Sequence, residues 1–300
     1  MGGYRSALVR PSSLEGAPMN TTMCITCIIV TRNPIHCHEL ITQLHRYGHP
    51  VIVVHPASTP APPDAISITT PSLVSPAVAR NLGAMQVTSD LLCFVDDDVR
   101  VDGDVPHILA HVFVAPHIVA CGAVLVDHPH NTYWQRALHR MAFAPQYHQH
   151  AQRIPPLLAS MMIVVRRITF NQVGGFDTTF HTPAGEDADL ALKLRSHGTL
   201  MTLPQARITH HPHPTDWLSI TRRCWRYGVC WPRIRLRHPS HMRPFPFPAP
   251  VTALALICGA PLFALYDTLR AWRAGHWIGY WWLRTWWYVG VAWGMHHAHD

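Results

Sequence analysis

Residues 91–98 of this chain read Leu-Leu-Cys-Phe-Val-Asp-Asp-Asp, and this stretch decides the fold class. Five consecutive apolar residues predict a short strand that is buried on both faces, as in a parallel sheet. The strand ends abruptly in Asp96, Asp97 and Asp98. Ligands of doubly wound sheets bind beyond the carboxyl ends of the strands, so these aspartates lie where chemistry is expected.

The same pattern extends to both sides of this strand. Strands are predicted at 24–30 and 51–54, and helices at about 35–48 and 75–88. Further along, strands at 118–125 and 159–165 and a helix at 186–197 are predicted, whereas residues 128–153 show no clear period. Alternating strands and helices predict an α/β fold, with a doubly wound, mostly parallel central sheet flanked by helices.

The composition excludes several classes of protein. Of 300 residues, 48% are apolar and only 14% are charged, against roughly 25% charged in an average soluble domain. A disordered or fibrous chain is therefore excluded, and part of the surface is expected not to face water. Lys193 is the single lysine among 24 cationic residues. Such an arginine bias reflects genomic composition, so the net charge of +7 predicts no nucleic-acid partner.

Cysteine usage indicates reduced thiols and no zinc site. Cys24 and Cys27 form a C-x-x-C pair, but they lie in an apolar run that predicts a strand. Side chains alternate along a strand, so the two thiols are expected to point to opposite faces. No second such pair follows, and zinc sites of this type need one.

The chain divides into four segments by composition. Residues 1–22 are polar and predict a flexible N-terminus, and residues 23–215 carry the α/β pattern. Residues 216–244 hold seven arginines and no acid except Asp216, and residues 245–295 are mostly apolar and rich in tryptophan. Apolar stretches of about 20 residues with aromatic flanks predict membrane-associated helices.

Two questions about the apolar segment stay open at this level. Prolines in its first half leave crossing of the bilayer and lying in its interface as alternatives. A tryptophan-rich helical cap on a soluble domain is a third possibility. The arginines that precede the segment predict that the α/β domain faces the cytoplasm, at a bacterial inner or plasma membrane.

Two groups of acids are candidates for chemistry. Carboxylates at the end of a buried strand, as at 96–98, suit a hard cation such as Mg²⁺ or Mn²⁺. The second group, Gly185-Glu-Asp-Ala-Asp-Leu190, begins the predicted helix. A carboxylate there can act as a general base on an acceptor hydroxyl. The alternatives are a solvated acidic turn for the first group and simple helix-dipole complementation for the second.

In order and spacing, five segments resemble the family 2 glycosyltransferases, which use nucleotide sugars and have the GT-A fold. The segments are Ile28-Ile-Val-Thr-Arg-Asn33, Ala79-Arg-Asn-Leu-Gly83, Phe94-Val-Asp-Asp-Asp98, Val173-Gly-Gly-Phe-Asp177 and Gly185-Glu-Asp-Ala-Asp-Leu190. The resemblance covers about residues 23–215. It implies an inverting, metal-assisted glycosyltransferase with Mg²⁺ or Mn²⁺ as cofactor. A nucleotide-sugar donor and an envelope, lipid-linked or polysaccharide acceptor would be its partners.

The resemblance also implies roles for individual residues. Asp187 would be the catalytic base, with Glu186 as the fallback. The metal ligands would be Asp98, Asp96 and one of His210 and His211. The donor-binding residues would be Thr31, Arg32, Asn33, Arg80, Asn81, Asp96, Asp97 and Asp98. The acceptor pocket would be Gly174, Gly175, Phe176 and Asp177.

Two places depart from the family's pattern. Where the family usually has an aspartate after the second strand, this chain has Val54-His-Pro-Ala-Ser58. His55 or a backbone group would have to replace that contact with the base, which puts a uridine nucleotide in doubt. Arg223-Cys-Trp-Arg-Tyr227 resembles only weakly the Q-x-x-R-W of processive synthases, and a lipid-facing basic helix is the alternative.

Two other functions compete with glycosyl transfer. A non-catalytic, nucleotide-sugar-binding membrane protein would keep the fold without turnover. A nucleotidyltransferase uses similar aspartate and metal chemistry, but it normally carries a glycine-rich loop and a lysine after the first strand. Thr31-Arg-Asn-Pro34 offers neither feature.

Overall fold

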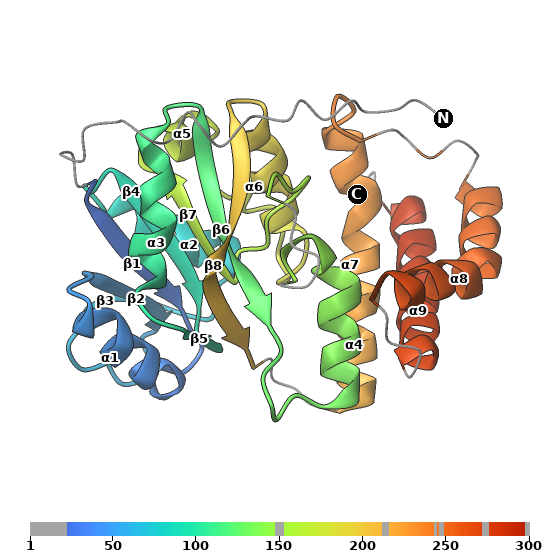
Figure 1. Ribbon diagram of the computed structural model, residues 1–300, viewed down its shortest axis with the longest axis horizontal. Coiled ribbons are helices and arrows are strands. Elements are labelled where there is room, and N and C mark those ends of the chain that lie inside the picture. The colour runs from blue at the N-terminus through green and yellow to red at the C-terminus, as the bar shows by residue number, and fades with distance from the viewer. Residues whose placement is uncertain are drawn as a thin grey trace.

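The computed structural model describes residues 23–147, 153–211, 216–242, 245, 249–271 and 276–297. Within them, eight strands form one sheet in the order β3-β2-β1-β4-β7-β6-β8-β5 (Figure 1). The strands are β1 (Ile25–Val30), β2 (Val51–Pro56), β3 (Ile66–Thr70), β4 (Leu91–Asp96), β5 (Val99–Val101), β6 (Ile118–Val126), β7 (Met162–Arg166) and β8 (Thr199–His210).

The sheet is mixed, with a parallel half that agrees with the predicted class. Strands β1 to β4 run parallel to one another, and β6 runs parallel to β8. Strand β7 is antiparallel to both β4 and β6, and β5 is antiparallel to β8. The predicted α/β fold with a mostly parallel sheet is thus confirmed, with β7 inserted in the opposite direction.

Helices cover both faces of the sheet, as a doubly wound fold requires. Alternating side chains of each strand feed two separate cores. Cys27 and Ile29 of β1 join the core under α1 (His38–Arg46) and α3 (Val105–Ala110). Ile28 joins the other core, under α2 (Pro76–Met85), α5 (Arg167–Gln172) and α6 (Glu186–Arg195). Short 3₁₀ helices complete the connections: η2 (Pro34–Cys37), η3 (His111–Val114) and η4 (Ala144–Gln146).

The register of the central strands brings the carboxyl ends of β1 and β4 to the same edge of the sheet. Strand β4 pairs with β1 so that Asp96 lies opposite Val30, and Thr31 therefore follows at the same edge. Helix α2 starts on this side, where the Ser75 hydroxyl accepts a hydrogen bond from the N–H of Val78. Pro76 in the first turn favours the same start because its missing N–H needs no partner there.

Four helices form a second layer beside the sheet. They are α4 (Tyr133–Ala142), α7 (Trp217–Arg237), α8 (Ala249–Ala271) and α9 (Trp277–His297). In Figure 1, α4 and α7 lie between the sheet and the pair α8 and α9. A third apolar core, which includes Leu138, Ile220 and Leu283, joins these helices.

One helix in the described residues, over Ala249–Leu269 of α8, is long and apolar enough to cross a membrane. Only 17% of that span is buried against the rest of the chain, and Leu254 and Leu262 are exposed. An apolar C-terminal helix was predicted from the sequence, and α8 is such a helix, with Pro261 inside it.

Candidate active site

A cavity of about 810 Å³ opens at the carboxyl ends of β1 and β4. It collects most of the predicted donor, metal and base residues: Thr31, Arg32, Arg80, Asp96, Asp97, Asp98, Glu186, Asp187, His210 and His211. They lie in α2, β4, α6 and β8 or directly after β1, β4 and β8, elements that are distant in the sequence. Helices α7 and α9 close the opposite side with Arg223, Arg226, Tyr227, Trp231 and Trp287.

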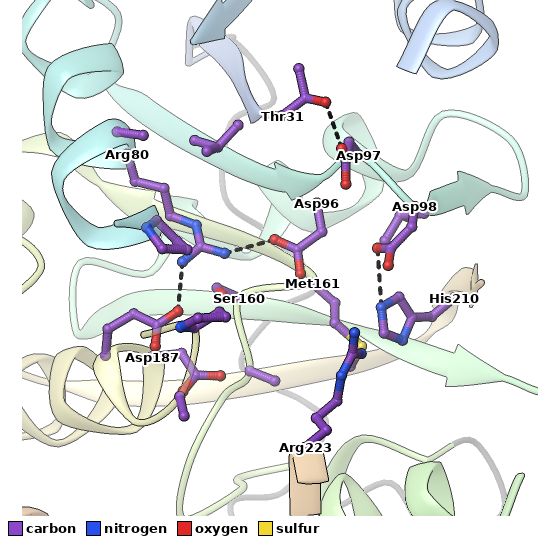
Figure 2. A pocket seen from close by; sticks show the side chains of 18 of the residues that line it. Thr31, Arg80, Asp96, Asp97, Asp98, Ser160, Met161, Asp187, His210 and Arg223 are labelled. Carbon is purple, nitrogen blue, oxygen red and sulfur yellow. Dashed lines mark hydrogen bonds and ion pairs between the residues drawn. The ribbon is translucent and has the colours of Figure 1, made fainter. Parts of the chain in front are cut away.

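A buried arginine organises one end of the cavity. Arg80 donates hydrogen bonds to Asp96 Oδ1 at 2.7 Å and to Glu186 Oε1 at 3.0 Å. A dashed line in Figure 2 marks the bond to Asp96. Burial disfavours its charge, but the two carboxylates outweigh burial and raise the pKa of Arg80. The guanidinium therefore holds the end of β4 and the start of α6 together.

The other end of the cavity carries two carboxylates and an imidazole. One ligand atom from each of Asp96, Asp98 and His210 lies within 4.8 Å of the others. His210 Nε2 is 3.1 Å from Asp98 Oδ1, the contact drawn as a dashed line in Figure 2. Burial opposes the charge of Asp98, but His210 and Arg223 outweigh it and lower its pKa. Two hard oxygen donors with one imidazole nitrogen fit Mg²⁺ or Mn²⁺.

Asp97 points away from this cluster, towards β1. Its Oδ2 accepts a 2.6 Å hydrogen bond from the Thr31 hydroxyl, which Figure 2 shows. Burial raises the pKa of Asp97 to about 6, although the Thr31 hydroxyl acts in the opposite direction. The three consecutive aspartates thus face three different partners: Arg80, Thr31 and His210.

Glu186 and Asp187 are adjacent, but their surroundings differ. Burial and the neighbouring Asp187 raise the pKa of Glu186 to about 7 in spite of Arg80. Burial also raises the pKa of Asp187, which Arg80 counteracts. Glu186 is held by Arg80, whereas Asp187 accepts from the N–H of Ala188 at 2.8 Å. Asp187 forms no ion pair within the described residues.

Gly185 explains how these acids reach the cavity. Its backbone has φ +91°, a conformation that residues other than glycine rarely adopt, and it lies immediately before α6. A Cβ there would lie 2.9 Å from Cys230 Cβ of α7. Glycine therefore lets α7 pack closely over the start of α6, which brings Asp187 next to the α7 side of the cavity.

Three groups of predicted residues lie elsewhere. Gly174, Gly175, Phe176 and Asp177 do not line the cavity. Phe176 packs in a core, with its ring 5.2 Å from the Arg80 guanidinium. Asn81 ties this loop to α2 by bonding both backbone groups of Phe176. Asn33 caps η2 through Ile35 N–H and also lies outside the lining.

The three histidines considered in the sequence analysis, His55, His210 and His211, have different surroundings in the cavity. His211 faces His128, with ring centroids 3.5 Å apart, so His210 rather than His211 lies with Asp96 and Asp98. Both ring nitrogens of His55 are already bonded, Nδ1 to Thr59 and Nε2 to Ser67.

Sequence reasoning missed the α7 and α9 wall of the cavity. Arg223, Arg226 and Tyr227 line it, so this part of α7 faces the cavity rather than lipid. The weak Q-x-x-R-W resemblance was the available signal. Trp287 of α9 contacts both Tyr227 and Trp231, with ring centroids 6.1 and 5.9 Å away. No local pattern distinguishes Trp287 from the other tryptophans of the apolar segment.

Comparisons with known proteins show the family and the fold of the chain. A profile of the family described as "Glycosyltransferase like family 2" matches residues 60–229, more than half of the chain. Two curated relatives are pre-mycofactocin glycosyltransferases of Mycobacterium tuberculosis, from strains CDC 1551 / Oshkosh and ATCC 25618 / H37Rv. Each is 31% identical over an alignment 188 residues long that covers 58% of this chain and 38% of the relative. The matched region therefore spans well under half of these relatives.

A solved structure shares the fold over most of the chain. The mannosyltransferase PcManGT from Pyrobaculum calidifontis, in complex with GDP-Man and Mn²⁺, superposes with a TM-score of 0.54. The superposition covers 89% of this chain and 90% of that one, at 17% sequence identity. At this identity the likeness supports the GT-A fold alone.

Proposed function

The chain belongs to the glycosyltransferase-like family 2, and we propose that it transfers a sugar from a nucleotide-sugar donor to a hydroxyl of an acceptor, with inversion. The observation that carries this proposal is the convergence of two acid groups on one cavity. Asp96, Asp98 and His210 form a cluster suited to a divalent cation, and Asp187 lines the same cavity.

The donor would bind at the end of the cavity that β1, α2 and β4 form. Asp96, Asp98 and His210 would hold Mg²⁺ or Mn²⁺, which neutralises charge on a diphosphate leaving group when bound. Arg80 keeps Asp96 in place through its 2.7 Å hydrogen bond. Arg32 and Arg223 line the same cavity and add positive charge towards a departing nucleotide.

Asp187 is the better candidate for the base. Glu186 accepts a hydrogen bond from Arg80 through Oε1, so this carboxylate already takes part in an ion pair. Asp187 forms no ion pair among the described residues, and burial raises its pKa in spite of the nearby Arg80. The raised pKa favours proton uptake by this carboxylate. It would take the proton from the acceptor hydroxyl, whose oxygen then attacks the anomeric carbon opposite the leaving group. A single displacement of this kind inverts the configuration.

The acceptor would approach from the α7 and α9 side of Asp187. Tyr227, Trp231 and Trp287 line that side with aromatic surface. The predicted acceptor loop, Gly174 to Asp177, lies outside the cavity, so it would act on the acceptor only indirectly. The apolar α8 is exposed, which supports membrane association and a lipid-linked or envelope acceptor, with the α/β domain in the cytoplasm.

A screen of labelled sugar nucleotides against membrane extracts tests the proposal. The full chain should transfer one sugar class in the presence of Mn²⁺ or Mg²⁺. The variant Asp187→Asn should lose transfer by a factor of about 10² to 10⁴ while it still binds the donor. The variant Asp98→Ala should instead weaken metal-dependent donor binding. Full turnover by Asp187→Asn would rule out the base assignment, and donor binding without any transfer would favour a non-catalytic binding protein.

A further inference from the structure

A second histidine lies directly behind His210. His139 belongs to α4 and is fully buried, with 0% of its surface exposed. Its Nε2 is 3.1 Å from His210 Nδ1, and the two rings are tilted by 34° with centroids 5.1 Å apart. His210 Nε2 faces Asp98 on the opposite side of the ring. The side chains of Asp98, His210 and His139 thus form a row that leads from the cavity to the buried face of α4.

The row restricts where the protons can lie. A neutral imidazole carries one proton, on either Nδ1 or Nε2. To bind a cation together with Asp96 and Asp98, His210 needs a bare lone pair on Nε2, so its proton must be on Nδ1. That N–H then donates to Nε2 of His139, which must accept. Metal-ligating histidines generally have such a partner on the second nitrogen, which fixes both tautomer and ring orientation.

His139 is a costly residue to bury in this place. Its Nδ1 has no hydrogen-bond partner among the described residues. An unpaired buried polar group lowers stability, and an apolar side chain of similar size would avoid that penalty. Packing alone therefore does not account for the imidazole. The position of α4 is fixed one residue further on, where Arg140 bonds Tyr147 and pairs with Asp127.

We propose that His139 is a positioning residue for the cation site: it accepts the Nδ1–H of His210 and so aims Nε2 of His210 at the metal. This inference rests on the proposed metal site. It adds a residue from outside the five recognised segments, on a helix that the sequence pattern did not reveal. His139 then holds the His210 ring through Nδ1, and Nε2 on the other side is left for the cation that Asp96 and Asp98 would share.

The test is the affinity of the full chain for Mn²⁺, which electron paramagnetic resonance measures through the signal of free Mn²⁺. His139→Leu should raise the Mn²⁺ dissociation constant about 10- to 100-fold. Its thermal stability in EDTA should change little, because loss of the unpaired His139 Nδ1 is offset by a buried His210 Nδ1 that is left without a partner. His139→Gln should restore much of the affinity, since its side-chain oxygen can reach the same Nδ1–H. His139→Asn, one methylene shorter, should not.

Two further variants separate the possible failures. His49→Leu removes another buried imidazole, whose Nε2 lies 2.6 Å from Asp104 Oδ1. Neither residue lines the cavity, so this variant should leave the Mn²⁺ affinity unchanged. His210→Ala should abolish tight binding. If the wild type and His210→Ala bind Mn²⁺ equally, the metal site of the proposed function is wrong. If His210→Ala loses Mn²⁺ but His139→Leu binds like the wild type, only the role of His139 is overturned.

Discussion

Replacing Arg80 with methionine should destabilise the chain by an amount that grows with pH. The Arg80 and Glu186 side chains are only 7% and 6% exposed, so water cannot take over the role of the guanidinium. Removing one partner of a buried ion pair costs about 3–5 kcal/mol because the other charge stays uncompensated. Glu186 can avoid that full cost by binding a proton.

The sign of the pH dependence follows from the pKa of Glu186. This pKa is raised to about 7 even with Arg80 present, and it must rise further without it. Below pH 7 the carboxyl of Arg80→Met is already neutral, so the loss there comes mainly from the contact with Asp96. Above pH 7 the folded variant retains a proton that the unfolded chain releases. Its stability relative to the wild type should therefore fall by about 1.4 kcal/mol per pH unit, up to the limit of the ion-pair cost.

Unfolding followed by circular dichroism at pH 6.5, 7.5 and 8.5 (values chosen to bracket that pKa, about 7) measures this slope. The matched control is the double variant Arg80→Met, Glu186→Gln, which keeps the shape of the site but cannot ionise at position 186. It should lose the part of the slope that comes from Glu186 and keep only the part that comes from Asp187, whose pKa Arg80 also lowers. An equal destabilisation of Arg80→Met at all three pH values, or the same slope in the double variant, would show that Glu186 is not the group that responds to Arg80.

Two further predictions concern the cavity, and a third concerns the crossing of α7 and α9 beside it. The acid limb of kcat/KM should lie above the ordinary aspartate pKa of 3.8, because burial raises the pKa of Asp187 and a protonated base is inactive; a limb at or below pH 4 would contradict this. Thr31→Val should move the pKa of Asp97 upwards from about 6, since the hydroxyl that favours the charged form is lost; carbon-13 NMR of the carboxyl reports it, and an unmoved titration would refute the contact. Gly290→Ala should lower stability by about 1–3 kcal/mol in thermal unfolding, because its Cβ would collide with the Trp225 carbonyl, whereas the control Gly259→Ala meets only the Phe263 ring at 3.3 Å; equal effects would refute the close crossing.

The sequence predicted the elements in which apolar residues form a clear run or a helical period. Strand β4 could be recognised because Leu91 to Val95 are all buried, and its end could be located because Asp96 breaks the run. Helix α6 was equally clear, with Gly185 before it and Leu190 and Leu194 inside. Because β1 and β4 are parallel neighbours, the meeting of their carboxyl ends could be anticipated from order alone.

Helix α4 was missed because polar side chains make up much of its buried face. Helix α4 buries Gln135, His139 and Arg140, so its inward face does not show as an apolar stripe. Its one local signal was the capping box between Thr132 and Gln135. Because α4 was not recognised, no role for His139 could be anticipated.

Strand β8 was missed for a different reason. Its pairing with β6 shifts register between Gly122 and Val124, and its last residues also pair with β5 on the other side. The pattern of inward and outward residues therefore does not keep a period of two along the strand. His210, the last residue of β8, could be predicted only from the family resemblance and not from a recognised strand.

The C-terminal helices and the cavity depend on each other through one helix crossing. A Cβ at Gly228 of α7 would collide with the Trp287 carbonyl, and a Cβ at Gly294 of α9 would collide with the Val229 carbonyl. Only glycine permits this approach, which is what brings Trp287 into the cavity wall. Helix α9 is joined in turn to α8, where Arg284 forms two hydrogen bonds with Asp267 at 2.8 and 3.1 Å.

A membrane that held the exposed apolar face of α8 would therefore restrain α9, and through the glycine crossing it would restrain the side of the cavity on which we place the acceptor. In this arrangement the apolar segment does more than attach the α/β domain to a surface. It supplies part of the wall opposite Asp187, so removing α8 and α9 should impair acceptor use while the residues around Asp96 and Asp98 keep their own contacts.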